Sequence, residues 1–230
     1  MPSPERIQSA FQSSVFTRTR QEGDDSNIAA LPDVSLEFLV ELCQVLSIKK
    51  VFEFGSGRST KALLGIGCQV TSLEDSEHWM QETQKTLTAV ERSRHKTMVK
   101  PLTRQFVGSF PVLGWELDQA MQSSIEQAEL ILIDSPYYTP FRESVLWTSL
   151  NVSNQAIVVL DDVRIPTIQH FCDRLVKANS SIQHRRVKVG HTFDVFYRNG
   201  KESLQLNQSI VDIIKGWRRY FQGTGDWIKE

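Results

Sequence analysis

A glycine-containing turn lies where an apolar segment gives way to a helical pattern. The segment is Glu53–Thr60, EFGSGRST. Glycines at such a turn let the backbone approach a ligand closely, and the helix N-terminus that follows presents free N–H groups and the positive end of a dipole. The residues expected to contact a bound cofactor here are Gly55, Ser56, Gly57 and Ser59. The alternative is a plain strand-to-helix connection in which a hydroxyl group caps the helix.

An acidic residue follows at a spacing typical of nucleotide recognition. Glu74 lies nineteen residues after Gly55, at the end of a second apolar segment, 69–74. A carboxylate at this place can accept hydrogen bonds from both hydroxyls of a ribose. Together with the glycine turn, Glu74 predicts an adenosine-containing cofactor. The candidates for its adenine contact are Asp75, Ser76 and the segment Gly108-Ser109-Phe110.

Two residues distinguish between adenosine cofactors. A dinucleotide fingerprint requires a third glycine at position 60, where this chain has Thr60. Glu53 would repel a pyrophosphate, but it suits a ligand with an ammonium group and a positive sulfur. These features favour S-adenosylmethionine over NAD. An NAD(P)-dependent oxidoreductase, which would use the same turn and the same Glu74, is the alternative.

Three more acids stand at the ends of short apolar runs. Asp134 ends the run LILID, and Asp161 and Asp162 follow AIVVL, 27 and 28 residues later. Buried parallel strands are typically such continuous runs, and their carboxyl ends meet at one edge of the sheet. We therefore expect these acids to converge with Glu53 and Glu74, where a cationic cofactor and a divalent metal ion could bind.

Apolar runs and helical patterns alternate along most of the chain. A helix is predicted at about 34–47, behind the capping candidates Asp33 and Ser35. Strands are predicted at 50–54, 69–74, 95–102, 130–134 and 156–161, and further helices at 59–64, 77–92, 141–150 and 167–178. This order predicts the α/β class, with a Rossmann-like, doubly wound, mostly parallel sheet and helices on both faces.

The two ends of the chain depart from this alternation. The runs 186–189 and 192–198 are separated by two residues, so they must pair as a hairpin that adds an antiparallel strand. An amphipathic helix is predicted at 210–221. We expect one domain over 1–230, made of an N-terminal appendage at 1–32 that is not a core element, a cofactor-binding core at 33–198 and a helical extension at 199–230.

Composition excludes several classes of protein. The 26 lysines and arginines balance 27 acids, giving a formal charge of −1, so long-range attraction to nucleic acid or an acidic membrane is not expected. Cys43, Cys68 and Cys172 form no paired motif, so neither a disulfide framework nor a zinc site is predicted. No segment has the apolar length of a signal peptide or a membrane span. We expect a cytoplasmic protein that acts on a small molecule.

Four ordered segments match the pattern of a known family. The segments are VFEFGSGRST, SLEDSEHWM with its Glu74-to-Trp79 spacing, ILIDSP followed by Arg142, and IVVLDDV. Over about residues 35–198 the sequence thereby resembles the class I S-adenosylmethionine-dependent methyltransferases, and their small-molecule branch in particular. The resemblance implies that Glu53, Gly55 and Ser56 line the methionine end of the cofactor, that Glu74 holds the ribose, and that Asp134 lies at the methyl-transfer site.

A narrower resemblance concerns metal. Catechol-type O-methyltransferases hold a divalent ion with an Asp after the fourth strand and an Asp-Asn pair after the fifth, so the resemblance implies Mg²⁺ or another divalent cation at Asp134, Asp161 and Asp162. Asp162 departs from the pattern, because the family has Asn there. Without a metal, Asp134 could pair with Arg142, while one acid of Asp161-Asp162 caps a turn and the other is solvated.

Other residues carry weaker signals for substrate binding or assembly. His191, at the hairpin turn, could reach the substrate, although a single histidine is more often only packed or exposed. Tyr137 and Tyr138, between two prolines, could cover a flat substrate or simply pack on the surface. Trp217 and Phe221 could belong to the core or to a homodimer face.

The leading hypothesis is methyl transfer from S-adenosylmethionine to a small molecule, with oxygen as the expected acceptor. The transfer is an in-line displacement, so the protein must align donor and acceptor and remove the acceptor's proton. Asp134, alone or through a metal, is the candidate for that step. A non-catalytic cofactor-binding module is a further alternative, and the acids that end the fourth and fifth strands favour an enzyme.

Overall fold

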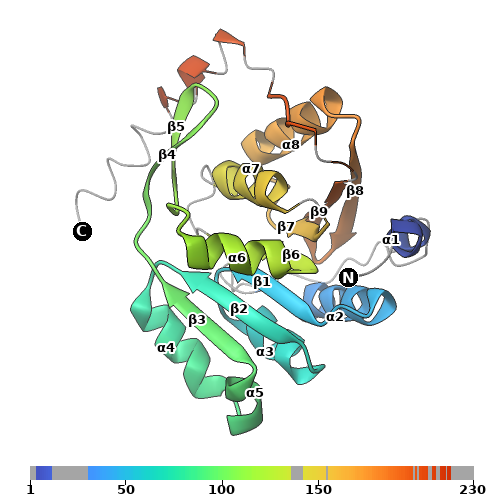
Figure 1. Ribbon diagram of the computed structural model, residues 1–230, viewed down its shortest axis with the longest axis vertical. Helices are drawn as coiled ribbons and strands as arrows, with labels where there is room; N and C mark the ends of the chain where they lie inside the picture. Colours follow the sequence, from blue (N-terminus) through green and yellow to red (C-terminus); the bar gives the residue numbers. More distant parts are fainter. Residues whose placement is uncertain are drawn as a thin grey trace.

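A single mixed sheet forms the centre of this computed structural model (Figure 1). The structure describes residues 4–11, 31–135, 142–153, 155–198, 200, 202–206, 209–210, 213–215 and 217–218. The seven strands, in spatial order, are β3 (His95–Val99), β2 (Gln69–Glu74), β1 (Lys50–Phe54), β6 (Leu130–Ile133), β7 (Ile157–Leu160), β9 (His191–Arg198) and β8 (Ile182–Val189). Only β9 runs against its neighbours, so the doubly wound sheet with one antiparallel C-terminal strand is confirmed.

Helices bury both faces of this sheet, because successive strand side chains point to opposite sides. In β1, Val51 joins an apolar cluster with α2 (Asp33–Leu46) and α3 (Arg58–Gly65), whereas Phe52 and Phe54 join a second cluster. The second cluster includes residues of α6 (Gln119–Gln127), α7 (Arg142–Val152) and α8 (Pro166–Ala178), which lie on the near side in Figure 1. The strands β1, β6 and β7 are almost fully buried, as their continuous apolar runs predicted.

The N-terminal segment differs from expectation. We expected no core element in residues 1–32, but α1 (Pro4–Phe11) packs on α2 and buries Ile7 and Ala10 in the first apolar cluster. Ile7 and Ala10 therefore lie on the face of α1 that is buried in the core. Residues 12–30 lie outside the described part of the chain.

The helix predicted at 77–92 is two helices, α4 (Glu77–Thr86) and α5 (Ala89–Ser93). Thr88 interrupts it, because its side chain caps α5 by accepting a hydrogen bond from the Glu91 N–H, while the Glu91 carboxylate accepts one from the Thr88 N–H. Leu87 at the break is buried. The capping pair Thr88 and Glu91 was readable in the sequence, but the helical periodicity around it concealed the break.

A hairpin of β4 (Thr103–Val107) and β5 (Phe110–Gly114) separates β3 from α6 and was not predicted. Gly108 and Ser109, considered as adenine contacts, form its turn, and Phe110 is buried in the second apolar cluster. Trp217 packs edge-on against Phe106 of this hairpin. Of the predicted C-terminal helix, 210, 213–215 and 217–218 are helical, and Phe221 lies outside the described residues.

The β8–β9 hairpin is fastened to α2 by one buried side chain. The hydroxyl of Ser35 donates to the carbonyl of Val189 at 2.6 Å and accepts from the N–H of His191 at 3.1 Å. Gly190, between them, has a φ of +71°, and a Cβ there would meet Ser35 and Pro32 at 3.1–3.2 Å. This contact fixes the start of β9. Among the described helices, none has the length and apolar character needed to cross a membrane.

Replacing Ser35 tests this fastening. Ser35→Ala leaves the carbonyl of Val189 and the N–H of His191 without their partner, so we expect the free energy of unfolding to fall by about 1–3 kcal/mol in urea titrations. Ser93→Ala removes a comparable hydroxyl bond on the exposed surface and should change it by less than about 0.5 kcal/mol. Equal stability of the two variants would show that the hairpin does not depend on Ser35.

Candidate active site at the carboxyl edge of the sheet

The parallel strands end at one edge of the sheet, where Glu74, Asp134, Asp161 and Asp162 lie. Backbone hydrogen bonds tie neighbouring strand ends together, from the Gly55 N–H to the Leu73 carbonyl (2.8 Å), from Asp134 to Phe54 (3.0 Å) and from Asp161 to Ile133 (3.0 Å). β9 runs the other way, so its first residue, His191, begins at this same edge. The expected convergence of the strand-end acids is confirmed for the ends of β1, β2, β6 and β7.

The glycine turn has the conformation that the sequence predicted. Gly55 has a φ of +94°, and a Cβ there would lie 2.9 Å from the Cβ of Ser135, so only glycine fits. A Cβ at Gly57 would meet nothing closer than the Trp79 indole nitrogen at 4.0 Å. The same nitrogen donates to the Ser56 carbonyl at 2.7 Å. Trp79 therefore braces a turn that stays open over Gly57, a role that its spacing from Glu74 alone did not reveal.

Glu74 lies directly beneath this turn. One carboxylate oxygen accepts hydrogen bonds from the Ser56 N–H (2.9 Å) and the Ser56 hydroxyl (3.2 Å), and the other accepts from the Asp75 N–H (3.2 Å). A carboxylate has about four acceptor positions, so capacity remains for donors on a ligand. Burial raises the pKa of Glu74 to about 7. Ser76, the other neighbour, is used as the N-cap of α4.

Glu53 does not face the open edge. Its side chain is 0% exposed, and its carboxylate accepts hydrogen bonds from the hydroxyls of Ser59, Thr60 and Ser72. Burial raises its pKa to about 7, although the three hydroxyls act in the opposite direction. Glu53 and Ser59 were both expected to contact the cofactor. Instead they hydrogen-bond to each other and support the glycine turn from its buried side.

Thr60 explains why the third glycine is missing. Its hydroxyl donates to Glu53 and accepts from the Gly57 N–H at 2.9 Å, and the side chain is fully buried. In a dinucleotide-binding turn, the third glycine lets the helix pack closely on the strand. Here a side chain fills that space and locks the turn to β1.

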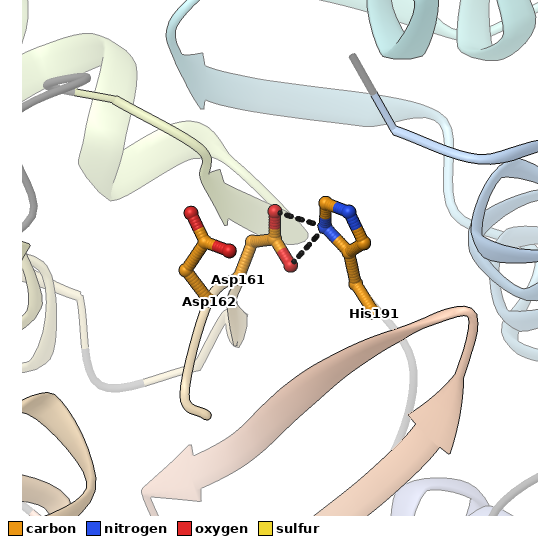
Figure 2. Close-up of side chains that lie close together, drawn as sticks. All are labelled: Asp161, Asp162 and His191. Atoms are coloured by element: carbon orange, nitrogen blue, oxygen red, sulfur yellow. Dashed lines mark hydrogen bonds and ion pairs between the residues drawn. The ribbon is translucent and has the colours of Figure 1, made fainter. Parts of the chain in front are cut away.

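The second half of the edge holds a compact cluster of Asp161, Asp162 and His191 (Figure 2). One potential ligand atom from each lies within 4.8 Å of the others. His191 Nδ1 contacts both oxygens of Asp161, at 2.9 and 3.1 Å, and its Nε2 points away from that carboxylate. The hydrogen bond to Asp161 raises the pKa of His191, whereas Asp161, despite its burial, has a lowered pKa because of His191 and Arg142.

Arg142, the first residue of α7, lies among the three predicted metal ligands. Its guanidinium is 3.5 Å from Asp134, 3.3 Å from Asp162 and 3.9 Å from Asp161. The expected pairing of Asp134 with Arg142 is therefore present. Burial and the negative charge of Asp161 raise the pKa of Asp134, and the same two causes raise that of Asp162.

The arrangement differs from the predicted metal site, because a guanidinium lies among the three carboxylates. Asp134 is not part of the described metal-capable cluster, and Asp161 already holds His191 through both oxygens. The predicted ligand set of Asp134, Asp161 and Asp162 is thus brought near one edge, but around an arginine.

Two predicted substrate contacts cannot be placed. Tyr137 and Tyr138 belong to 136–141, which lie outside the described residues. His191, in contrast, belongs to the cluster with Asp161 and Asp162, although a single histidine is a weak signal in the sequence. Its signal was positional, because the first residue of a strand antiparallel to the rest starts at the edge where the other strands end.

Comparison with known proteins rests on structure, because the sequence matches no family model and no curated protein. A methyltransferase of Geobacter sulfurreducens has a TM-score of 0.56 at 11% identity, over 87% of this chain and 98% of that one. An S-adenosylhomocysteine-bound methyltransferase of Podospora anserina gives 0.53 at 11%, over 87% and 98%. A Staphylococcus aureus protein provisionally assigned as a caffeoyl-CoA O-methyltransferase gives 0.52 at 16%, over 85% and 98%.

These similarities confirm the resemblance at the level of the fold. Each of the three neighbours is matched over 98% of its length. The chain therefore has the Rossmann-like fold of the class I S-adenosylmethionine-dependent methyltransferases.

Proposed function

We propose that this chain is an S-adenosylmethionine-dependent methyltransferase that methylates an oxygen atom of a small molecule. The observation that supports it most is the edge on which an open glycine turn, the Glu74 carboxylate and the Asp161–His191 pair lie together. A ligand seated on the turn would end beside a residue able to take a proton. The methyltransferase fold of the neighbours supports the same proposal.

The turn and Glu74 fit the proposed cofactor. The backbone of Gly55–Gly57 can approach the ligand closely, Glu74 has acceptor capacity for ribose hydroxyls, and Asp75 follows it half-buried. S-adenosylmethionine, when bound, supplies a methyl group on a positively charged sulfur. An edge rich in carboxylates favours such a cation over the pyrophosphate of NAD(P), and Thr60 occupies the space that a dinucleotide turn leaves empty.

His191 is suited to accept the proton of the methyl acceptor. Asp161 holds its Nδ1, which fixes the ring and leaves Nε2 as the basic nitrogen. Asp134 keeps the role that the sequence proposed for it, at the edge of the transfer site, but its carboxylate is engaged by Arg142. We therefore assign proton removal to His191 and the positioning of its ring to Asp161.

The proposal also covers the substrate class, the cellular location and the assembly of the chain. The balanced charge supports a small-molecule substrate rather than nucleic acid, and the lack of a paired cysteine motif supports a cytoplasmic location. A homodimer through Trp217 would have to use a side chain that already packs on Phe106.

Calorimetric titration tests the cofactor class. We expect S-adenosylmethionine and S-adenosylhomocysteine to bind and NADH to give no saturable heat. Gly57→Val, which places a branched side chain over the open turn, should abolish binding while the fold is kept. Tight binding of NADH with no binding of either sulfur ligand would overturn the proposal in favour of an oxidoreductase.

Glu74 should make cofactor binding depend on pH. Ribose hydroxyls donate to the ionised carboxylate, and its pKa in the free protein is about 7, so binding should strengthen as pH rises from 6 to 8, by about tenfold in Kd for S-adenosylhomocysteine. Glu74→Gln should weaken binding and remove this dependence. Glu77→Gln, an exposed acid on α4, should leave the profile unchanged. An unchanged profile in Glu74→Gln would refute the ribose role.

His191 should govern the acid limb of activity. His191→Gln should lower kcat by roughly 10²–10⁴-fold without changing the affinity for S-adenosylhomocysteine. Because Asp161 raises the pKa of His191 and only the neutral ring accepts a proton, Asp161→Asn should move the acid limb of kcat/KM to lower pH. The control is His170→Gln, an exposed histidine on α8. Full activity with an unshifted profile in His191→Gln would exclude this role.

A further inference from the structure

We propose that Arg142 is the permanent cation of the acidic edge and that it keeps divalent metal ions out of the Asp134, Asp161 and Asp162 cluster. The sequence motifs predicted a metal at this place, and the structure puts a guanidinium there instead. The inference concerns metal binding, so it does not depend on the proposed activity.

The guanidinium of Arg142 lies within 3.9 Å of the side-chain carboxylate of each of the three acids. It reaches Asp134 through Nη2 at 3.5 Å, Asp162 through Nη2 at 3.3 Å and Asp161 through Nη1 at 3.9 Å. Nη2 also donates to the backbone carbonyl of Asp134 at 2.7 Å. A side chain that bridges the ends of two strands in this way has a fixed position, since any movement breaks several contacts together.

Burial makes the guanidinium hard to displace. The Arg142 side chain is only 3% exposed and Asp161 is 1% exposed, so solvent screens their attraction weakly. An arginine stays charged at every physiological pH. A metal ion entering the cluster would have to expel this cation or share its carboxylates with it.

Two further side chains, those of His191 and Arg164, contact the carboxylates of Asp161 and Asp162. His191 engages both oxygens of Asp161, and Arg164 approaches Asp162 at 3.7 Å from an exposed position. Of the two arginines near Asp162, only Arg142 is buried and reaches all three acids. This difference supplies a matched control, because Arg164 touches the same carboxylate without closing the cluster.

Manganese titration, followed by the electron paramagnetic resonance signal of free Mn²⁺, tests the proposal. Wild-type protein should bind no Mn²⁺ at the cluster, and Arg142→Met, which keeps length but removes charge, should gain a site. Arg164→Met should gain none. Adding Asp161→Ala to Arg142→Met should abolish the gained site, because it removes a carboxylate ligand from the cluster.

The wild-type protein alone can overturn the proposal. Binding of Mn²⁺ by wild type that is lost in Asp161→Ala would show that the cluster takes a metal despite Arg142. A folded Arg142→Met that gains no Mn²⁺ site would show that the arginine is not what excludes the ion. If Arg142→Met does not fold, as judged by circular dichroism, Arg142→Gln provides the same test with a polar side chain.

Discussion

The structure depends on one electrostatic constraint, the repulsion among carboxylates that a parallel sheet collects at one edge. Glu53, Glu74, Asp134, Asp161 and Asp162 end or follow four adjacent strands, so the topology itself brings them together. Buried carboxylates are costly unless they are hydrogen-bonded, paired or protonated. The residues around them stabilise the carboxylates in two ways. Neutral hydrogen-bond donors do so in one half of the edge, and a cation does so in the other.

In the half formed by β1 and β2, neutral donors meet the carboxylates. Hydroxyl and amide groups bind Glu53 and Glu74, no cation approaches either among the described contacts, and burial raises both pKa values to about 7. In the half formed by β6 and β7, Arg142 supplies positive charge and His191 hydrogen-bonds to Asp161. The first half thus holds its carboxylates without a cation among their described contacts, whereas the second half pairs its carboxylates with Arg142.

The sequence predicted the fold well because its strongest signals are local. The apolar runs of 50–54, 130–134 and 156–161, with acids at their ends, specified buried parallel strands, and a two-residue turn specified the terminal hairpin. The β4–β5 hairpin was missed because its strands alternate polar and apolar residues weakly. The pairing of Arg142 with Asp134 was predicted, but its contacts with Asp161 and Asp162 were not, since they depend on tertiary distances between a helix and a second strand. Glu53 shows the opposite case. The sequence predicted that it contacts the cofactor, but its side chain is fully buried and cannot reach a ligand at the edge.

A crystal structure of the protein grown with S-adenosylhomocysteine and Mn²⁺, with anomalous data collected at the manganese edge, tests this account most directly. The account predicts ribose hydroxyls on Glu74, the ligand backbone over Gly57, the Arg142 guanidinium among the three aspartates, and no anomalous peak between them. An anomalous peak bound by Asp161 and Asp162 with Arg142 displaced, or a ligand bound away from the glycine turn, would contradict it.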